Sequence, residues 1–196
     1  TCQFTSIEIL NLPKKIMRYI FSLFIALLIG QTSYSQDFED LDKSPMDAII
    51  VRDDNSNAPL IRVIYSRPKK RGREIFGGLV PYDKVWRTGA NESTEITFYQ
   101  PMFLGDQHID KGTYTLYTIP EKNSWTVIIN EAVNTWGAYN YDKDLDVVRH
   151  QVKVKKTPTT IETFSMAFKQ VKNGIDLIMG WDQSFVEVPF RKNESN

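Results

Sequence analysis

Arginine, amide and carboxylate side chains gather in one irregular stretch of this sequence, from Arg67 to Glu92. Within it, Arg87 is followed closely by Asn91 and Glu92. An arginine guanidinium presents a planar fork of donors that suits a carboxylate, a phosphate or sugar hydroxyls. The same charges could instead pair with one another, because buried charges in proteins are normally paired. The stretch therefore predicts either a ligand site or a structural ion pair between Arg87 and Glu92 or Glu95.

Aromatic side chains near these polar groups would complete a site for a sugar or a small anion, since a flat ring packs against the ligand. Trp86 adjoins Arg87, and if that segment is extended the two side chains point to opposite faces. The tryptophans could equally fill the core. The candidate ligand-binding residues are Arg67, Arg73, Trp86, Arg87, Asn91, Glu92, Trp136 and Tyr139.

Catalytic motifs are sparse. The one cysteine, Cys2, precedes the predicted mature protein, and neither a G-x-S-x-G nor an H-E-x-x-H motif occurs. A thiolate nucleophile and a zinc–thiolate site are therefore excluded for the mature chain. A hydrolase of a glycan or an ester could use two carboxylates, for which Glu92 and Asp146 are the nominal candidates. The sequence favours a non-enzymatic role and leaves this alternative open.

The sequence also lacks the residue spacings of known calcium and zinc motifs. Asp142, Asp144 and Asp146 alternate as in a calcium-binding loop, but Val147 and Lys153 stand where that loop needs glycine and glutamate. The two histidines of the chain have no zinc-site spacing. We therefore predict no metal and no cofactor.

The elements that must position these residues are strands. Apolar residues alternate with polar ones along most of the chain, as in 60–66, where Ile61, Val63 and Tyr65 share a face. Asn173-Gly174 between two such runs predicts a tight hairpin. The pattern predicts an all-β fold, an antiparallel β-sandwich or flattened barrel of about eight to ten strands. The irregular stretch is expected to be one long ordered loop, with a helical turn near Glu74.

The start of the chain predicts export. After Met17 and Arg18 come about ten apolar residues, and then small residues that end at Ser35. We expect cleavage there and a periplasmic or extracellular location, with no transmembrane segment in the mature chain. The predicted organisation is an upstream and signal segment over 1–35, a linker over 36–44, one β-sandwich domain over 45–190 and a tail over 191–196.

Several segments resemble the bacterial family called "domain of unknown function 2911", which is common among exported proteins. The likeness is carried by Y-S-R-P at 65–68, by I-F-G-G-L-V-P-Y at 75–82, by V-W-R-T-G-A-N-E at 85–92 and by W-G-A-Y at 136–139. Lys111 stands where the family often has a small residue. The resemblance implies export and a single domain, and it implies no activity.

The net charge of the chain limits the classes of partner that it is expected to bind. The chain has 24 basic and 24 acidic residues, a formal net charge of zero at pH 7. A nucleic-acid partner usually requires a strongly basic surface, so we expect none. The sequence favours a binding module for a small polar ligand, a glycan or an envelope protein. The alternatives are the carboxylate-dependent hydrolase and a structural protein of the envelope.

Overall fold

The computed structural model describes residues 13–29 and 36–192. The chain divides into two units between Asp40 and Leu41. In the first unit, the helix α1 (Lys14–Ile29) contains the apolar run that the sequence assigns to a signal segment. None of the described helices has the length and apolar character needed to cross a membrane. The cleavage point predicted after Ser35 lies outside the described residues.

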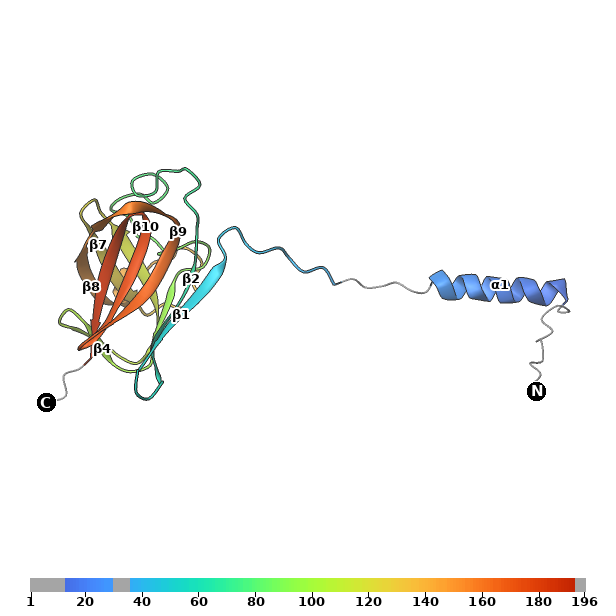
Figure 1. Cartoon of the computed structure of the whole chain (residues 1–196), viewed down its shortest axis with the longest axis horizontal. Helices are drawn as coiled ribbons and strands as arrows, with labels where there is room; N and C mark the ends of the chain where they lie inside the picture. The colour runs from blue at the N-terminus through green and yellow to red at the C-terminus, as the bar shows by residue number, and fades with distance from the viewer. Residues whose placement is uncertain (1–12, 30–35, 193–196) are drawn as a thin grey trace, which may run out of the picture. The chain divides into compact units, whose positions relative to one another are not determined.

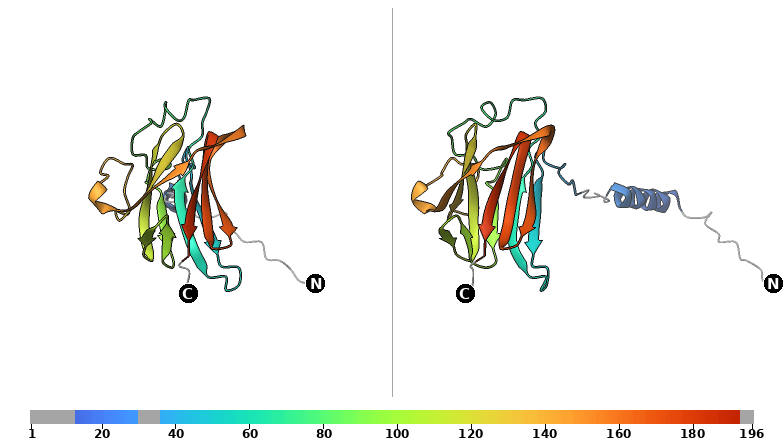
Figure 2. Two further views of the ribbon diagram at one scale, coloured as in Figure 1. Left: turned by 90° about the vertical axis from the view of Figure 1, so that its left-hand side faces the viewer. Right: turned by 60° about the vertical axis from the view of Figure 1, so that its left-hand side comes forward.

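The second unit consists of two antiparallel sheets that face each other (Figure 2). The six-stranded sheet has the order β1 (Met46–Arg52), β2 (Pro59–Ser66), β3 (Glu95–Phe98), β6 (Gly112–Pro120), β7 (Ser124–Asn130) and β8 (Asp146–Lys153). The four-stranded sheet has the order β5 (Gln107–Ile109), β4 (Met102–Leu104), β10 (Gly174–Arg191) and β9 (Lys155–Val171). The sheets do not close into a barrel, so the predicted all-β fold is confirmed as a sandwich.

Apolar and polar side chains alternate along the strands, which explains why the two sheets pack face to face. Ile61 and Val63 of β2 are fully buried, and in the register of the sheet they pair with Phe98 and Ile96 of β3, which are fully buried too. Residues that lie opposite each other on neighbouring strands share a face, so these side chains form one apolar layer. Burying such a layer against the second sheet contributes about 25 cal/mol per Å² of apolar surface.

The strands β9 and β10, orange to red in Figure 1, form a hairpin. Its connecting turn lies one residue before the predicted Asn173-Gly174 turn. Val171 pairs with Gly174, so Lys172 and Asn173 form the connection. A Cβ atom on Gly174 would lie 2.1 Å from the backbone oxygen of Phe190. The glycine therefore permits close packing inside β10 and is not itself one of the two connecting residues.

The loop that the sequence predicts from Arg67 to Glu92 is ordered, as expected, and pairs with both sheets. Near β9, the amide of Phe164 donates to the oxygen of Pro68 at 2.9 Å. The expected helical turn near Glu74 is absent, because the amide of Val80 bonds to the oxygen of Ile75 at 2.8 Å and closes a wider loop. Farther along, Trp86 and Thr118 of β6 exchange backbone hydrogen bonds of 2.7 and 3.0 Å, which extends the six-stranded sheet.

An aromatic cluster fills the core where the loop meets the sheets. The Trp86 ring stacks on Trp181 of β10, with ring centres 6.1 Å apart and planes 17° apart. Trp125 and Phe164 meet Trp86 edge-on at 6.1 and 5.1 Å. The indole nitrogen of Trp86 donates to the oxygen of Gly89 at 3.1 Å, so its polar atom is satisfied inside the core. Three of the four tryptophans of the chain are thus buried, and the fourth is Trp136.

Candidate functional site

Arg87 lies on the outer face of the six-stranded sheet. Trp86 points into the core opposite Thr118, and successive side chains of an extended segment alternate in direction. The Nε atom of Arg87 is buried without a hydrogen-bond partner, and within the described ranges no carboxylate pairs with this guanidinium. The expected ion pair with Glu92 or Glu95 does not form. Glu95 instead accepts a hydrogen bond from the amide of Asn134 at 2.9 Å.

The loop after Arg87 turns back and pairs with the segment after β7. The amide of Thr94 donates to the oxygen of Arg87 at 3.1 Å, which closes the loop. The amide of Ser93 then donates to the oxygen of Thr135 at 2.9 Å. Glu92 and Trp136 form an antiparallel bridge. Because residues opposite each other in such a bridge share a side, the Glu92 carboxylate and the Trp136 indole are neighbours.

Two aromatic rings stand out from this surface. The side chains of Trp136 and Tyr139 are 62% and 80% exposed. Gly137 between them has a φ of +65°, and a Cβ atom there would lie 2.6 Å from the Tyr139 ring. Glycine adopts this backbone conformation at low cost and leaves room for the ring. The Trp-Gly-Ala-Tyr segment therefore presents both aromatic rings to solvent.

A cavity of about 180 Å³ opens beside Glu92. The register of the sheet explains its floor, because Ser66 pairs with Met46 and Ile64 pairs with Glu95 across neighbouring strands, so all four face outward. Its charged lining consists of two glutamates among the described residues. The lining residues are Met46, Ile64, Tyr65, Ser66, Glu92, Ser93, Glu95, Asn134 and Thr135.

The start of the domain also contacts this region. The Asn91 side chain donates to Oδ1 of Asp42 at 3.0 Å. The pKa of Asp42 is lowered, first by the hydrogen bond from the Ser44 amide and then by that from Asn91. Asn91 therefore holds the segment before β1 against the loop, and part of its hydrogen-bonding capacity is used within the protein.

The remaining candidates lie elsewhere. Arg67 forms an ion pair of 2.9 Å with Asp47 and donates to the hydroxyl of Ser165 at 2.9 Å, so it links the two sheets. Arg73 donates to the backbone oxygen of Lys69 at 2.6 Å and so stabilises its own loop. Trp86 belongs to the core. Backbone contacts thus bring Asn91 and Glu92 against Trp136 and Gly137, with the Tyr139 ring next to Gly137, and they connect Arg87 to the same loop through Thr94. Arg67, Arg73 and Trp86 are held by partners of their own.

Asp146, the second carboxylate of the hydrolase alternative, is held by its neighbours. Its oxygens accept hydrogen bonds from Tyr141 at 2.5 Å, Arg149 at 2.6 Å and Asn130 at 2.8 Å, and its side chain is 5% exposed. The pKa of Tyr141 is raised to about 12, chiefly by burial and then by the bond to Asp146. This set of contacts was not predicted from the sequence, and it anchors the loop between β7 and β8.

The neighbouring aspartates have a local role as well. Oδ1 of Asp142 accepts a hydrogen bond from the amide of Asp144 at 2.9 Å and caps a short 3-10 helix, Lys143–Leu145. Within the described ranges, no group of three or more histidine, cysteine or acidic side chains is arranged to hold a metal ion. The alternating aspartates are thus accounted for by a helix cap and an ion pair.

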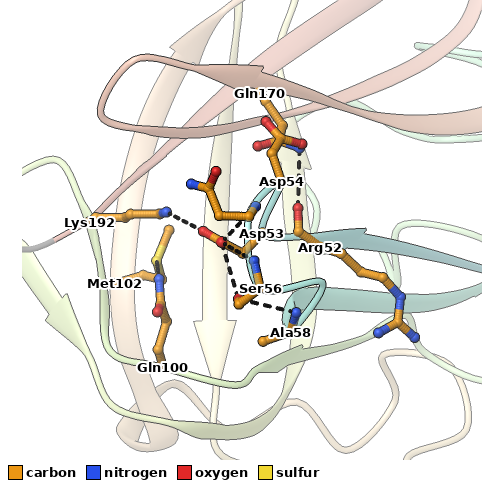
Figure 3. A network of polar contacts seen from close by, with 10 residues as sticks. Arg52, Asp53, Asp54, Ser56, Ala58, Gln100, Met102, Gln170 and Lys192 are labelled. Atoms are coloured by element: carbon orange, nitrogen blue, oxygen red, sulfur yellow. Dashed lines mark hydrogen bonds and ion pairs between the residues drawn. The ribbon is translucent and has the colours of Figure 1, made fainter.

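Another polar cluster lies at the turn between β1 and β2 (Figure 3). Oδ1 of Asp53 accepts hydrogen bonds from the amides of Asn55 and Ser56 at 3.1 and 3.0 Å, and Lys192 lies 3.4 Å from Oδ2. These bonds, led by that from the Ser56 amide, lower the pKa of Asp53 to about 2. Every acceptor bond of Asp53 serves to close the turn or to fix the end of β10.

Glu95 and Ser66 are site residues that sequence reasoning did not select as ligand contacts. Each occupies an outward position of a half-buried strand, where polar residues are expected on any solvated face. Their grouping depends on the pairing of β2 with β3, which no local signal reveals.

Comparisons with known proteins identify a family but no individual relative. No curated protein and no solved structure matches the chain. The family model described as "Protein of unknown function (DUF2911)" matches residues 44–190, which include nearly the whole sandwich and every residue of the candidate site. The chain therefore belongs to the DUF2911 family of proteins of unknown function.

Proposed function

We propose that this protein is an exported binding module that holds a small polar ligand on the outer face of its six-stranded sheet. The observation that carries the proposal is the position of Trp136. Its indole is 62% exposed beside Glu92, whereas the other three tryptophans are at most 8% exposed. Exposed tryptophan and tyrosine rings next to unpaired polar groups are typical of surfaces that bind ligands.

Each member of the site has a distinct part in this proposal. Trp136 and Tyr139 provide flat apolar faces for a ring or an aliphatic stretch of the ligand. The unpaired guanidinium of Arg87 orients an acceptor group, and the Glu92 carboxylate accepts hydrogen bonds from donors of the ligand. The Nη atoms of Arg87 support this assignment, because they are not buried and have no hydrogen-bond or ion-pair partner within the described ranges.

A binding role is favoured over hydrolysis by the contacts of Asp146. Both oxygens of that carboxylate are occupied by donors from the same chain, and the side chain is almost inaccessible. A general acid or base must reach its substrate. Glu92 and Asp146, the pair nominated from the sequence, therefore do not form a two-carboxylate site.

Thermal denaturation in the presence of candidate ligands tests the proposal, since a ligand that binds only the folded state raises the melting temperature by mass action. The panel comprises sugars, small anions, amines and divalent metals. We expect at least one class to stabilise the wild-type protein, and we expect the effect to be lost in Trp136→Ala. Phe38→Ala, which removes another exposed aromatic ring far along the chain, is the control. Stabilisation that survives Trp136→Ala unchanged would exclude the proposed surface.

Export is tested separately. The proposal rests on the basic, apolar and small-residue pattern that ends at Ser35. We expect the protein recovered outside the cytoplasm to begin at Gln36. Recovery of the chain in the cytoplasm with residues 17–35 still attached would contradict it.

A further inference from the structure

The cavity beside Trp136 carries a charge preference of its own. Its charged lining residues in the described part of the chain are Glu92 and Glu95, and no lysine, arginine or histidine lines it. Oε1 of Glu95 accepts one hydrogen bond, from Asn134. Glu92 is exposed, and neither glutamate has an ion-pair partner within the described ranges. Two carboxylates that share one concave space favour a cation between them.

The hydroxyl of Ser66, an otherwise buried residue, supplies a third acceptor at the same place. Ser66 is 2% exposed and lines the cavity, and its hydroxyl has no hydrogen-bond partner among residues 13–29 and 36–192. The hydroxyl is not one of the buried atoms that lack a partner, so it reaches the cavity and is available to a ligand there. Its outward position opposite Met46 brings it to the floor of the cavity.

We infer that this cavity binds the ammonium group of a small organic cation. This inference rests on the proposed function, because it names the ligand class of the same site. A primary ammonium carries three N–H donors and no acceptor. Glu92, Glu95 and Ser66 offer it two carboxylates and one hydroxyl.

The other walls select an organic cation over a metal ion. Met46 and Ile64 are apolar lining residues, and Trp136 lies next to two lining residues, as the bridge partner of Glu92 and the chain neighbour of Thr135. A calcium ion takes six to eight oxygen ligands, which two carboxylates and one hydroxyl do not supply. An aliphatic chain attached to an ammonium would instead contact the apolar side chains while the charge meets the glutamates.

The size of the cavity limits the ligand. A volume of about 180 Å³ equals the liquid volume of about six water molecules. A ligand group of about that many heavy atoms, such as a butylammonium or the end of a lysine-like side chain, fits the space. Such a small probe is expected to bind in the millimolar range.

Calorimetric titration of the purified protein with n-butylammonium, 1-butanol and butyrate tests the inference. These probes share the alkyl chain and differ in the charged group. We expect saturable binding of n-butylammonium alone. Glu95→Gln should weaken it about tenfold or more, because it removes a charge but keeps an oxygen for the Asn134 amide. Ser66→Ala should weaken it about two- to tenfold.

Glu74→Gln is the matched control, since Glu74 is an exposed glutamate outside the cavity. It should leave the affinity unchanged. Equal binding of butanol and butylammonium, or equal weakening by Glu74→Gln and Glu95→Gln, would overturn the inference. A third outcome is that sugars or anions bind, that Trp136→Ala abolishes their binding, and that amines do not bind. In that case the ammonium assignment is wrong, but the proposed binding function is supported. If no ligand class binds, both are wrong.

Discussion

The indole of Trp86 lies among Trp125, Phe164 and Trp181, whereas the indole of Trp136 faces mainly solvent. Both residues come from irregular segments, and the sequence around them does not distinguish the two situations. The distinction comes from the partner strands, since Trp86 pairs with β6 and points inward, while Trp136 pairs with the loop at Glu92. One residue type thus contributes to stability at one position and, in our proposal, to recognition at the other.

Alanine substitutions at these two positions should separate the roles. Trp86→Ala should lower the free energy of unfolding by about 3–5 kcal/mol, because it opens a cavity inside the aromatic cluster. Trp136→Ala should change it by less than about 0.5 kcal/mol, as is usual for an exposed side chain. Urea unfolding followed by circular dichroism measures both values. A large loss of stability in Trp136→Ala would show that this indole is part of the core.

Asp146 makes a second residue-scale prediction. Asp146→Ala leaves Tyr141, Arg149 and Asn130 without their shared acceptor and should lower the free energy of unfolding by about 1–3 kcal/mol. Asp144→Ala, which removes a nearby exposed carboxylate, should be close to neutral and serves as the control. Equal effects of the two substitutions in urea unfolding would show that the contacts of Asp146 contribute nothing.

At the scale of elements, the β1–β2 turn predicts a pH dependence. The pKa of Asp53 falls from 3.8 to about 2 on folding, so its ionised form stabilises the folded state. That contribution is fully present above about pH 4 and is lost as the pH falls through about 2. Asp53→Asn should therefore unfold more easily than the wild type at pH 5, and the difference should shrink as the pH falls from 4 to 2. A difference that stays constant down to pH 2 would contradict the account.

The Trp-Gly-Ala-Tyr segment gives an element-scale prediction about binding. Gly137→Ala forces a left-handed backbone on alanine and brings its Cβ against the Tyr139 ring. Gly72→Ala has a similar φ of +71° but meets nothing within 4 Å, so it carries the backbone cost alone. Both variants should lose about 1 kcal/mol of stability. Only Gly137→Ala should weaken ligand binding, as measured by titration, and equal affinities of the two variants would argue against a role for Tyr139.

Local signals predict the strands better than they predict the site. Alternation over 60–66 places β2 within a residue of its observed bounds, because one face of the strand is buried and the other is solvated. That the loop over 67–92 is well ordered could be predicted from its apolar residues, such as Ile75, which is buried. Its path could not be predicted, because pairings such as that of Pro68 with Phe164 join segments far apart in the sequence. The cavity likewise combines residues from β1, β2, β3 and the loop after β7.

At the scale of the whole molecule, the two faces of the six-stranded sheet have different surroundings. The inner face packs against the four-stranded sheet (Figure 2), and the aromatic cluster lies between the two sheets. The outer face carries Arg87, the two glutamates of the cavity and the exposed rings of Trp136 and Tyr139. A site that is built on a sheet with a packed reverse side keeps its geometry, because the strands beneath it cannot move independently.

Amide chemical shifts recorded by NMR during a titration with n-butylammonium test this account most directly. We predict that the largest changes fall in 91–95 and 134–137 and at Ser66, with the strands of the four-stranded sheet unaffected. Changes confined to β9 and β10, or an unaltered spectrum at millimolar probe, would contradict a ligand site on the outer face.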